Sequence, residues 1–153
     1  MFKNPYFKNA LSALAVAVLG FVLLNLAFIL FALFTRAILL FLPADFARTS
    51  RWFMPLMLII FVFIIALVSW LIFKSGLGEI YKAVYLTMPS AVIFVAISIL
   101  LYRQPAAAYG VNALVLGAII VYLYETKKPW LYYYAVVLVA TVLLITALLG
   151  VDI

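Results

Sequence analysis

The chain has 153 residues, of which 72% are hydrophobic and 9% are charged. A soluble domain is about half apolar and a quarter charged, so lipid rather than water must surround most of these side chains. The net charge of +6 comes from Lys and Arg residues that lie in the gaps between apolar runs, where they meet lipid headgroups. They form no basic patch of the kind that binds nucleic acid. We therefore expect an all-α membrane protein, with residues 1–153 forming one bundle of five transmembrane helices joined by short loops.

The sequence contains neither Cys nor His. This composition excludes disulfides, thiol nucleophiles, iron–sulfur clusters and Cys-based zinc sites, and it removes the commonest haem ligand. We accordingly expect no cofactor and no metal site.

The first apolar run, residues 10–34, is much longer than the apolar part of a cleaved signal peptide, so we expect it to be an uncleaved first span. The apolar pattern continues past Arg36 into residues 37–42. One helix over the whole run would be about 50 Å long, which exceeds the ~30 Å hydrocarbon core. Residues 37–42 are therefore expected either to extend this helix or to lie at the membrane interface.

The second span is expected over residues 53–73, with Pro55 in the first turn, where a missing N–H is harmless. The third is expected over residues 83–102. Pro89 lies inside it, and a helix that began at Pro89 would be too short to cross the membrane. We therefore expect the third helix to begin earlier and to kink at Pro89.

The fourth span is expected over residues 107–124. A very short connection that contains Arg103, Gln104 and Pro105 joins it to the third span, so these two helices should be adjacent and antiparallel. The fifth is expected over residues 130–149. The aromatic residues at its start are typical of a headgroup-level belt, which we favour over a binding cage for a cation or sugar.

The distribution of basic residues predicts the orientation of the chain in the membrane. With five spans, one side holds Lys3, Lys8, Lys74, Lys82, Lys127 and Lys128. The opposite side holds Arg48, Arg51 and Arg103, together with Arg36 if its side chain reaches that surface. Because basic residues favour the cytoplasmic side, we expect the N-terminus inside and the C-terminus outside. The small size and the lack of sorting signals favour the cytoplasmic membrane of a prokaryotic cell.

Two spans carry stripes of small residues at helical spacing. The stripe on the fourth span consists of Ala106, Gly110, Ala113 and Gly117, which fall within about 60° of one another around the helix. The stripe on the first span consists of Ala10, Ala13 and Ala17, with Gly20 nearby. Small residues let helices approach closely, and close packing is the main attraction between helices in lipid. We interpret both stripes as helix-packing seams, and a glycine-lined channel is the alternative.

Asn25 in the first span and Asn112 in the fourth are the candidate polar groups of the membrane interior. Asn112 lies on nearly the opposite face from the small-residue stripe, so the fourth span is expected to have neighbours on two sides, as a central helix would. An unpaired amide is costly in hydrocarbon, so each Asn needs a partner. Ser69, Ser98, Thr141 and Thr146 are the candidate partners, although the Thr hydroxyls can also bond to their own helix backbone. We interpret the two Asn as interhelical contacts, with a polar lining for a small ligand as the alternative.

Arg36 lies eleven residues after Asn25 and therefore on the same helix face. Near the end of the span its guanidinium can reach the headgroups at little cost. The alternatives are a site for an anionic lipid headgroup or a contact with a partner subunit.

The sequence does not favour enzyme activity, because Asp45, Glu79, Glu125 and Asp152 all lie in gaps or at the end and form no carboxylate pair. A Ser–Lys pair at Ser75 is formally possible. No motif identifies a family. We expect an accessory or structural subunit that packs against itself or against other membrane subunits. The alternative is a small transporter or channel for neutral, apolar or lipid-like molecules, with a polar cavity around Asn25 and Asn112.

Overall fold

The computed structural model describes residues 5–43, 45 and 50–149. Lys3, Arg48 and Asp152, which the sequence analysis used, lie outside these residues. The described residues form five long helices: α1 (Pro5–Leu39), α3 (Phe53–Lys74), α4 (Glu79–Leu100), α5 (Pro105–Glu125) and α6 (Trp130–Leu148). Each is long and apolar enough to cross a membrane. The predicted all-α bundle of a multi-pass membrane protein is therefore confirmed.

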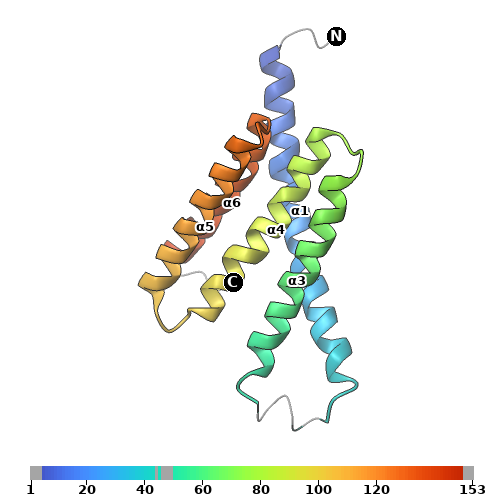
Figure 1. The fold of residues 1–153 in the computed structure, drawn as a ribbon, viewed down its shortest axis with the longest axis vertical. Helices are drawn as coiled ribbons and strands as arrows, with labels where there is room; N and C mark the ends of the chain where they lie inside the picture. Colours follow the sequence, from blue (N-terminus) through green and yellow to red (C-terminus); the bar gives the residue numbers. More distant parts are fainter. Residues whose placement is uncertain (1–4, 44, 46–49, 150–153) are drawn as a thin grey trace.

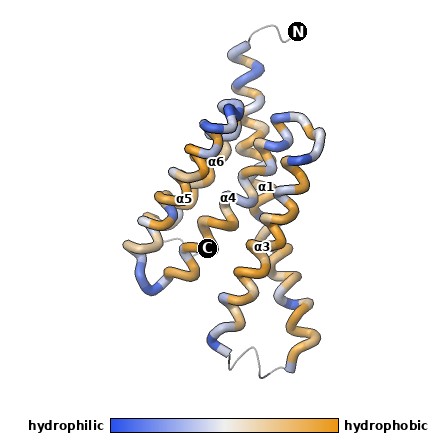
Figure 2. Tube along the Cα trace, viewed as in Figure 1, coloured by the Kyte–Doolittle hydropathy of each residue, from blue (hydrophilic) through white to orange (hydrophobic). Residues whose placement is uncertain are grey.

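The helices traverse the molecule in alternating directions (Figure 1). The α3–α4 and α5–α6 connections lie at the end from which α1 projects, and the α4–α5 connection lies at the other end. Polar residues gather at these two ends, whereas the helix centres are apolar (Figure 2). This distribution fits a hydrocarbon layer across the middle of the bundle, with polar groups in contact with headgroups and water on both sides.

Helix boundaries agree with the sequence signals at most ends. Pro105 begins α5, where its missing N–H costs nothing. The third helix, however, begins at Glu79 rather than at Ala83. Gly78 has an extended backbone at the N-cap, and the carboxylate of Glu79 is favourable in the first turn because the helix dipole is positive there. Pro89 lies inside α4, so the helix does begin before it, as predicted.

The first helix continues without interruption past Arg36 to Leu39, and residues 40–42 form a turn and a bend. Residues 37–39 therefore extend the helix. At 35 residues α1 is about 52 Å long, well beyond the ~30 Å hydrocarbon thickness.

The tight connection between α5 and α6 is closed by a Schellman motif. The N–H of Lys128 donates to the carbonyl of Leu123 at 3.0 Å, and the N–H of Lys127 donates to the carbonyl of Tyr124 at 3.1 Å. Lys127 has a φ of 49°, the left-handed conformation that this motif requires and that glycine usually supplies. The motif pairs two carbonyls that the end of α5 would otherwise leave free.

Helix α4 is the centre of the bundle, because it contacts each of the other four helices. In Figure 1, α5 and α6 lie on one side of α4 and α3 lies on the other. The buried side chains of α4 include several small ones: Ala83, Thr87, Ser90, Ala91 and Ala96. These small side chains allow the neighbouring backbones to approach α4 closely.

Two apolar clusters share α1 and α4. The larger one joins α1 and α4 to α5 and α6, with Val16, Ala91 and Val136 among its most buried members. The smaller one joins α1 and α4 to α3 and includes Ala27 and Phe61. The chain is thus two small bundles that are fused along the α1–α4 contact.

The α1–α4 contact depends on Gly20. An added Cβ at Gly20 would lie 2.8 Å from Cγ2 and 2.9 Å from Oγ1 of Thr87, which is itself buried. Of the stripe predicted on the first span, Gly20 is buried against α4, Ala13 and Ala17 are half-buried, and Ala10 is exposed. Buried Val16 and Ala27 complete the face of α1 that meets α4.

Candidate functional site

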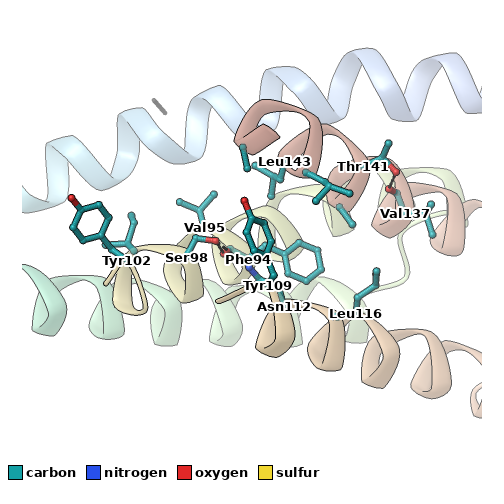
Figure 3. Close-up of a pocket in the computed structure, with 15 residues that line it drawn as sticks. Phe94, Val95, Ser98, Tyr102, Tyr109, Asn112, Leu116, Val137, Thr141 and Leu143 are labelled. Atoms are coloured by element: carbon teal, nitrogen blue, oxygen red, sulfur yellow. Dashed lines mark hydrogen bonds between the residues drawn. The ribbon is translucent and has the colours of Figure 1, made fainter. Parts of the chain in front are cut away.

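A pocket of about 790 Å³ lies between α4, α5 and α6 (Figure 3). Its lining is mainly aliphatic and aromatic, and it contains no Asp, Glu, Lys or Arg. The polar side chains in the lining are Ser98 and Tyr102 from α4 and the turn after it, Tyr109 and Asn112 from α5, and Thr141 from α6. An apolar pocket of this size with a few converging polar groups is the usual form of a small-molecule site.

The polar centre of the pocket is the side-chain contact between Ser98 and Asn112. Nδ2 of Asn112 donates to Oγ of Ser98 at 3.0 Å, and Oγ of Ser98 donates to the carbonyl of Phe94 at 2.9 Å. Oδ1 of Asn112 is buried and has no hydrogen-bond partner among the described residues. Ser98 was one of the expected partners, so the interhelical contact predicted for Asn112 is present, but it leaves half of the amide unpaired.

The other predicted partners form their hydrogen bonds elsewhere. The hydroxyl of Ser69 lies 3.3 Å from the hydroxyl of Tyr85. The hydroxyls of Thr141 and Thr146 donate to backbone carbonyls of α6. The two Thr residues thus satisfy themselves locally, which the sequence analysis had named as an alternative.

Asn25 lies far from this arrangement. Its Nδ2 donates to the carbonyl of Phe21 at 2.8 Å, and the side chain is exposed on the outside of α1. Nine residues separate it from buried Val16, so at about 100° per residue Asn25 points directly away from the bundle. It does not line the pocket. The structure therefore does not bring Asn25 and Asn112 together around one cavity.

Arg36 is also exposed on the outer side of α1 and lies in the last turn of that helix. A basic side chain is favourable there because the carbonyls of a helix C-terminus carry partial negative charge. The position near the helix end fits a guanidinium that reaches toward headgroups.

The small-residue stripe of the fourth span lies on an open face of α5. Ala106, Gly110, Ala113 and Gly117 are all exposed, and nothing lies within 4 Å of a Cβ added at either glycine. The expectation that this helix is central within the chain is wrong. It packs only on its Asn112 side, because α4 holds the central place instead.

Sequence reasoning did not anticipate the contact between Gly20 and Thr87 or the side-chain bond between Glu79 and Tyr132. The small and hydroxyl-bearing residues of α4, at helical spacing, were the signal for a helix buried on several sides. This signal is weaker in the sequence than the regularly spaced glycines of α5.

The fold thus defines the class of the protein: a multi-pass bundle of five helices that are each able to cross a membrane. Comparisons with protein-family models, with curated proteins and with solved structures give no match.

Proposed function

We propose that the protein is a structural subunit of a membrane assembly, which packs against further transmembrane helices and catalyses no reaction. The observation that carries this proposal is the open face of α5. Its stripe of Ala106, Gly110, Ala113 and Gly117 has free space where side chains would normally be. In lipid, such a face gains more from close contact with another helix than from contact with disordered acyl chains.

Asn25 supports the same proposal from a different helix. An amide offers four hydrogen-bonding positions, and Asn25 uses one of them on its own backbone. The remaining positions point away from the bundle at a depth where lipid tails offer no partner. A polar group on a neighbouring helix would supply one, and a contact of this kind between helices contributes about 1 kcal/mol.

The alternative, a transporter or channel, has less support. It requires a continuous polar cavity around Asn25 and Asn112, and these residues lie on different helices and face different directions. The pocket beside Asn112 supports binding of a ligand more directly than passage of one.

The charge distribution supports an orientation with the N-terminus in the cytoplasm and the C-terminus outside, and the small size of the chain favours a prokaryotic cytoplasmic membrane. Among the described residues, Lys8, Lys74, Lys82, Lys127 and Lys128 belong to the end that would face the cytoplasm. Arg51 and Arg103 belong to the opposite end. The excess of basic residues on one side is the signal that orients multi-pass proteins.

Single-cysteine crosslinking in native membranes tests the assembly proposal, and the natural chain has no cysteine to interfere. We expect Gly117→Cys to form a crosslinked product under mild oxidation. Phe63→Cys is the matched control, because it lies at a similar depth on the exposed face of α3. A product of twice 17.1 kDa identifies a second copy of the chain, and another mass identifies a different subunit. Equal results for the two positions, together with a solitary 17.1 kDa species after gentle extraction, would refute the proposal.

A further inference from the structure

The pocket between α4, α5 and α6 contains an incomplete hydrogen-bonding group. Among the residues that the structure describes, the Asn112 amide has one side-chain partner, Oγ of Ser98, whose own proton goes to the carbonyl of Phe94. Within that part of the chain, Oδ1 of Asn112 is buried without a partner. Turning the amide over would exchange its oxygen and nitrogen, but one end would still be unpaired. A buried acceptor left without a donor is costly in an apolar setting, so this site favours a ligand that completes it.

The lining determines the charge of that ligand. None of the described residues that line the pocket is acidic or basic, so an anionic or cationic headgroup would lose its hydration without gaining a counter-charge from them. A pure hydrocarbon would fill the volume but leave the amide unpaired. A hydroxyl both donates and accepts, so one such group could serve Oδ1 and the remaining N–H of Asn112.

The position of the amide determines how the ligand would lie. Asn112 is seven residues into α5, about 10 Å from its first residue, and Ser98 is close to the end of α4. The amide therefore lies about a third of the way along α5. From there the pocket continues along Leu116 and Val137 toward the middle of α5 and α6 (Figure 3). This geometry suits a polar group near the surface with an apolar chain directed inward.

We propose that this pocket binds a neutral membrane amphiphile, a long-chain lipid alcohol whose hydroxyl pairs with the Asn112 amide and whose chain lies between α4, α5 and α6. The volume of about 790 Å³ is within the range of small-molecule sites, roughly 300–1,000 Å³. The proposal is tested separately from the assembly proposed above, because Gly110 and Gly117 of the stripe do not line the pocket, whereas Ala113 belongs to both the stripe and the lining.

Photolabelling of the full chain in phosphatidylcholine vesicles tests the proposal, with a hexadecanol that carries a diazirine on its chain as the probe. We expect label on α5 and α6 within the pocket lining. Unlabelled hexadecanol should compete with the probe and hexadecane should not. Asn112→Leu should lower labelling by about five- to tenfold, the effect of losing about 1 kcal/mol of hydrogen bonding. Asn25→Leu removes an exposed amide from α1 and should leave labelling unchanged.

A second variant keeps the test decisive if Asn112→Leu fails to fold. Ala147 lines the pocket and is exposed, so Ala147→Trp fills the cavity without entering the buried core. It should also lower labelling while the helical content measured by circular dichroism stays that of the natural chain. Equal competition by hexadecane, or unchanged labelling in whichever of the two variants folds, would overturn the proposal.

Discussion

The hydroxyl of Tyr132 donates a hydrogen bond of 2.6 Å to Oε2 of Glu79, which joins the first turn of α6 to the first turn of α4. The Tyr132 side chain is only 1% exposed. Its ring also lies 6.4 Å from that of Phe73 and 5.7 Å from Nζ of Lys128. Tyr132 thus joins the ends of α3, α4 and α6 to the α5–α6 connection, at the surface that we propose to be cytoplasmic.

Removing this hydroxyl by Tyr132→Phe should lower the free energy of unfolding by about 1.5 kcal/mol, because hydrogen bonds to charged groups contribute about 1.5–3 kcal/mol. The lower end applies because Glu79 is exposed and keeps water as an alternative partner. Titration with sodium dodecyl sulfate in mixed micelles, followed by circular dichroism, measures the change. Glu79→Gln keeps an acceptor and should cost less. A Tyr132→Phe protein as stable as the natural chain would contradict the prediction.

At the α1–α4 contact, Gly20→Ala should destabilise the protein by about 1–3 kcal/mol, the usual cost of overpacking a core. The new Cβ would meet the Thr87 side chain at 2.8 Å. Thr87→Ala removes both of the closest atoms, so the double variant should be more stable than the sum of the single changes predicts. Strict additivity in the same unfolding titration would show that the two residues do not interact.

On the open face of α5, Gly110→Leu should leave the unfolding free energy of the single chain within about 0.5 kcal/mol of the natural value, because nothing lies within 4 Å of the new Cβ. The same change should weaken assembly, since a large side chain keeps a neighbouring helix at a distance. Energy transfer between labelled copies in vesicles, or recovery of companion subunits after extraction, measures assembly. A folded variant that assembles normally would show that this face is not a contact.

In the α5–α6 connection, Lys127→Gly should stabilise the protein by about 1 kcal/mol, because a left-handed conformation costs an L-residue about 1–2 kcal/mol and costs glycine almost nothing. The position has a φ of 49°. Lys128→Gly is the matched control, because Lys128 is not among the residues with positive φ. Lower stability for Lys127→Gly than for the control would contradict the assignment of the Schellman motif.

The predicted orientation is tested by reporters fused to the C-terminus. Alkaline phosphatase, which is active only outside the cytoplasm, should be active in this fusion, and green fluorescent protein should remain dark. The opposite pattern would place the lysine-rich side outside and would contradict the charge rule for this chain.

The sequence was sufficient to predict the fold class and most helix ends, because long apolar runs, prolines and charged gaps are local signals. It was not sufficient to place the helices around one another. The stripe on α5 and the small residues of α4 satisfy the same rule for close packing, and only the three-dimensional arrangement shows that α4 is enclosed while the stripe is open.

The candidate site was predictable to a similar extent. Asn112 and Ser98 were both identified from the sequence, because polar side chains are rare inside apolar spans. The unpaired Oδ1 was not predictable, since it depends on the rotation of α5 against α4. Asn25 carries the same sequence signal as Asn112, yet it lies on the outside of the bundle.

The central place of α4 has a consequence for biosynthesis. Synthesis proceeds from the N-terminus, so α4 enters the bilayer after α1 and α3 but before α6. Until α6 inserts, the side of α4 that α6 covers in the final fold is in contact with lipid. The buried hydroxyls of α4 need no partner from a later helix, because Thr87 donates to the carbonyl of Val84 and Ser90 to that of Leu86 within the same helix. A precursor of α1, α3 and α4 therefore leaves neither of these two hydroxyls without a hydrogen bond before α5 and α6 insert.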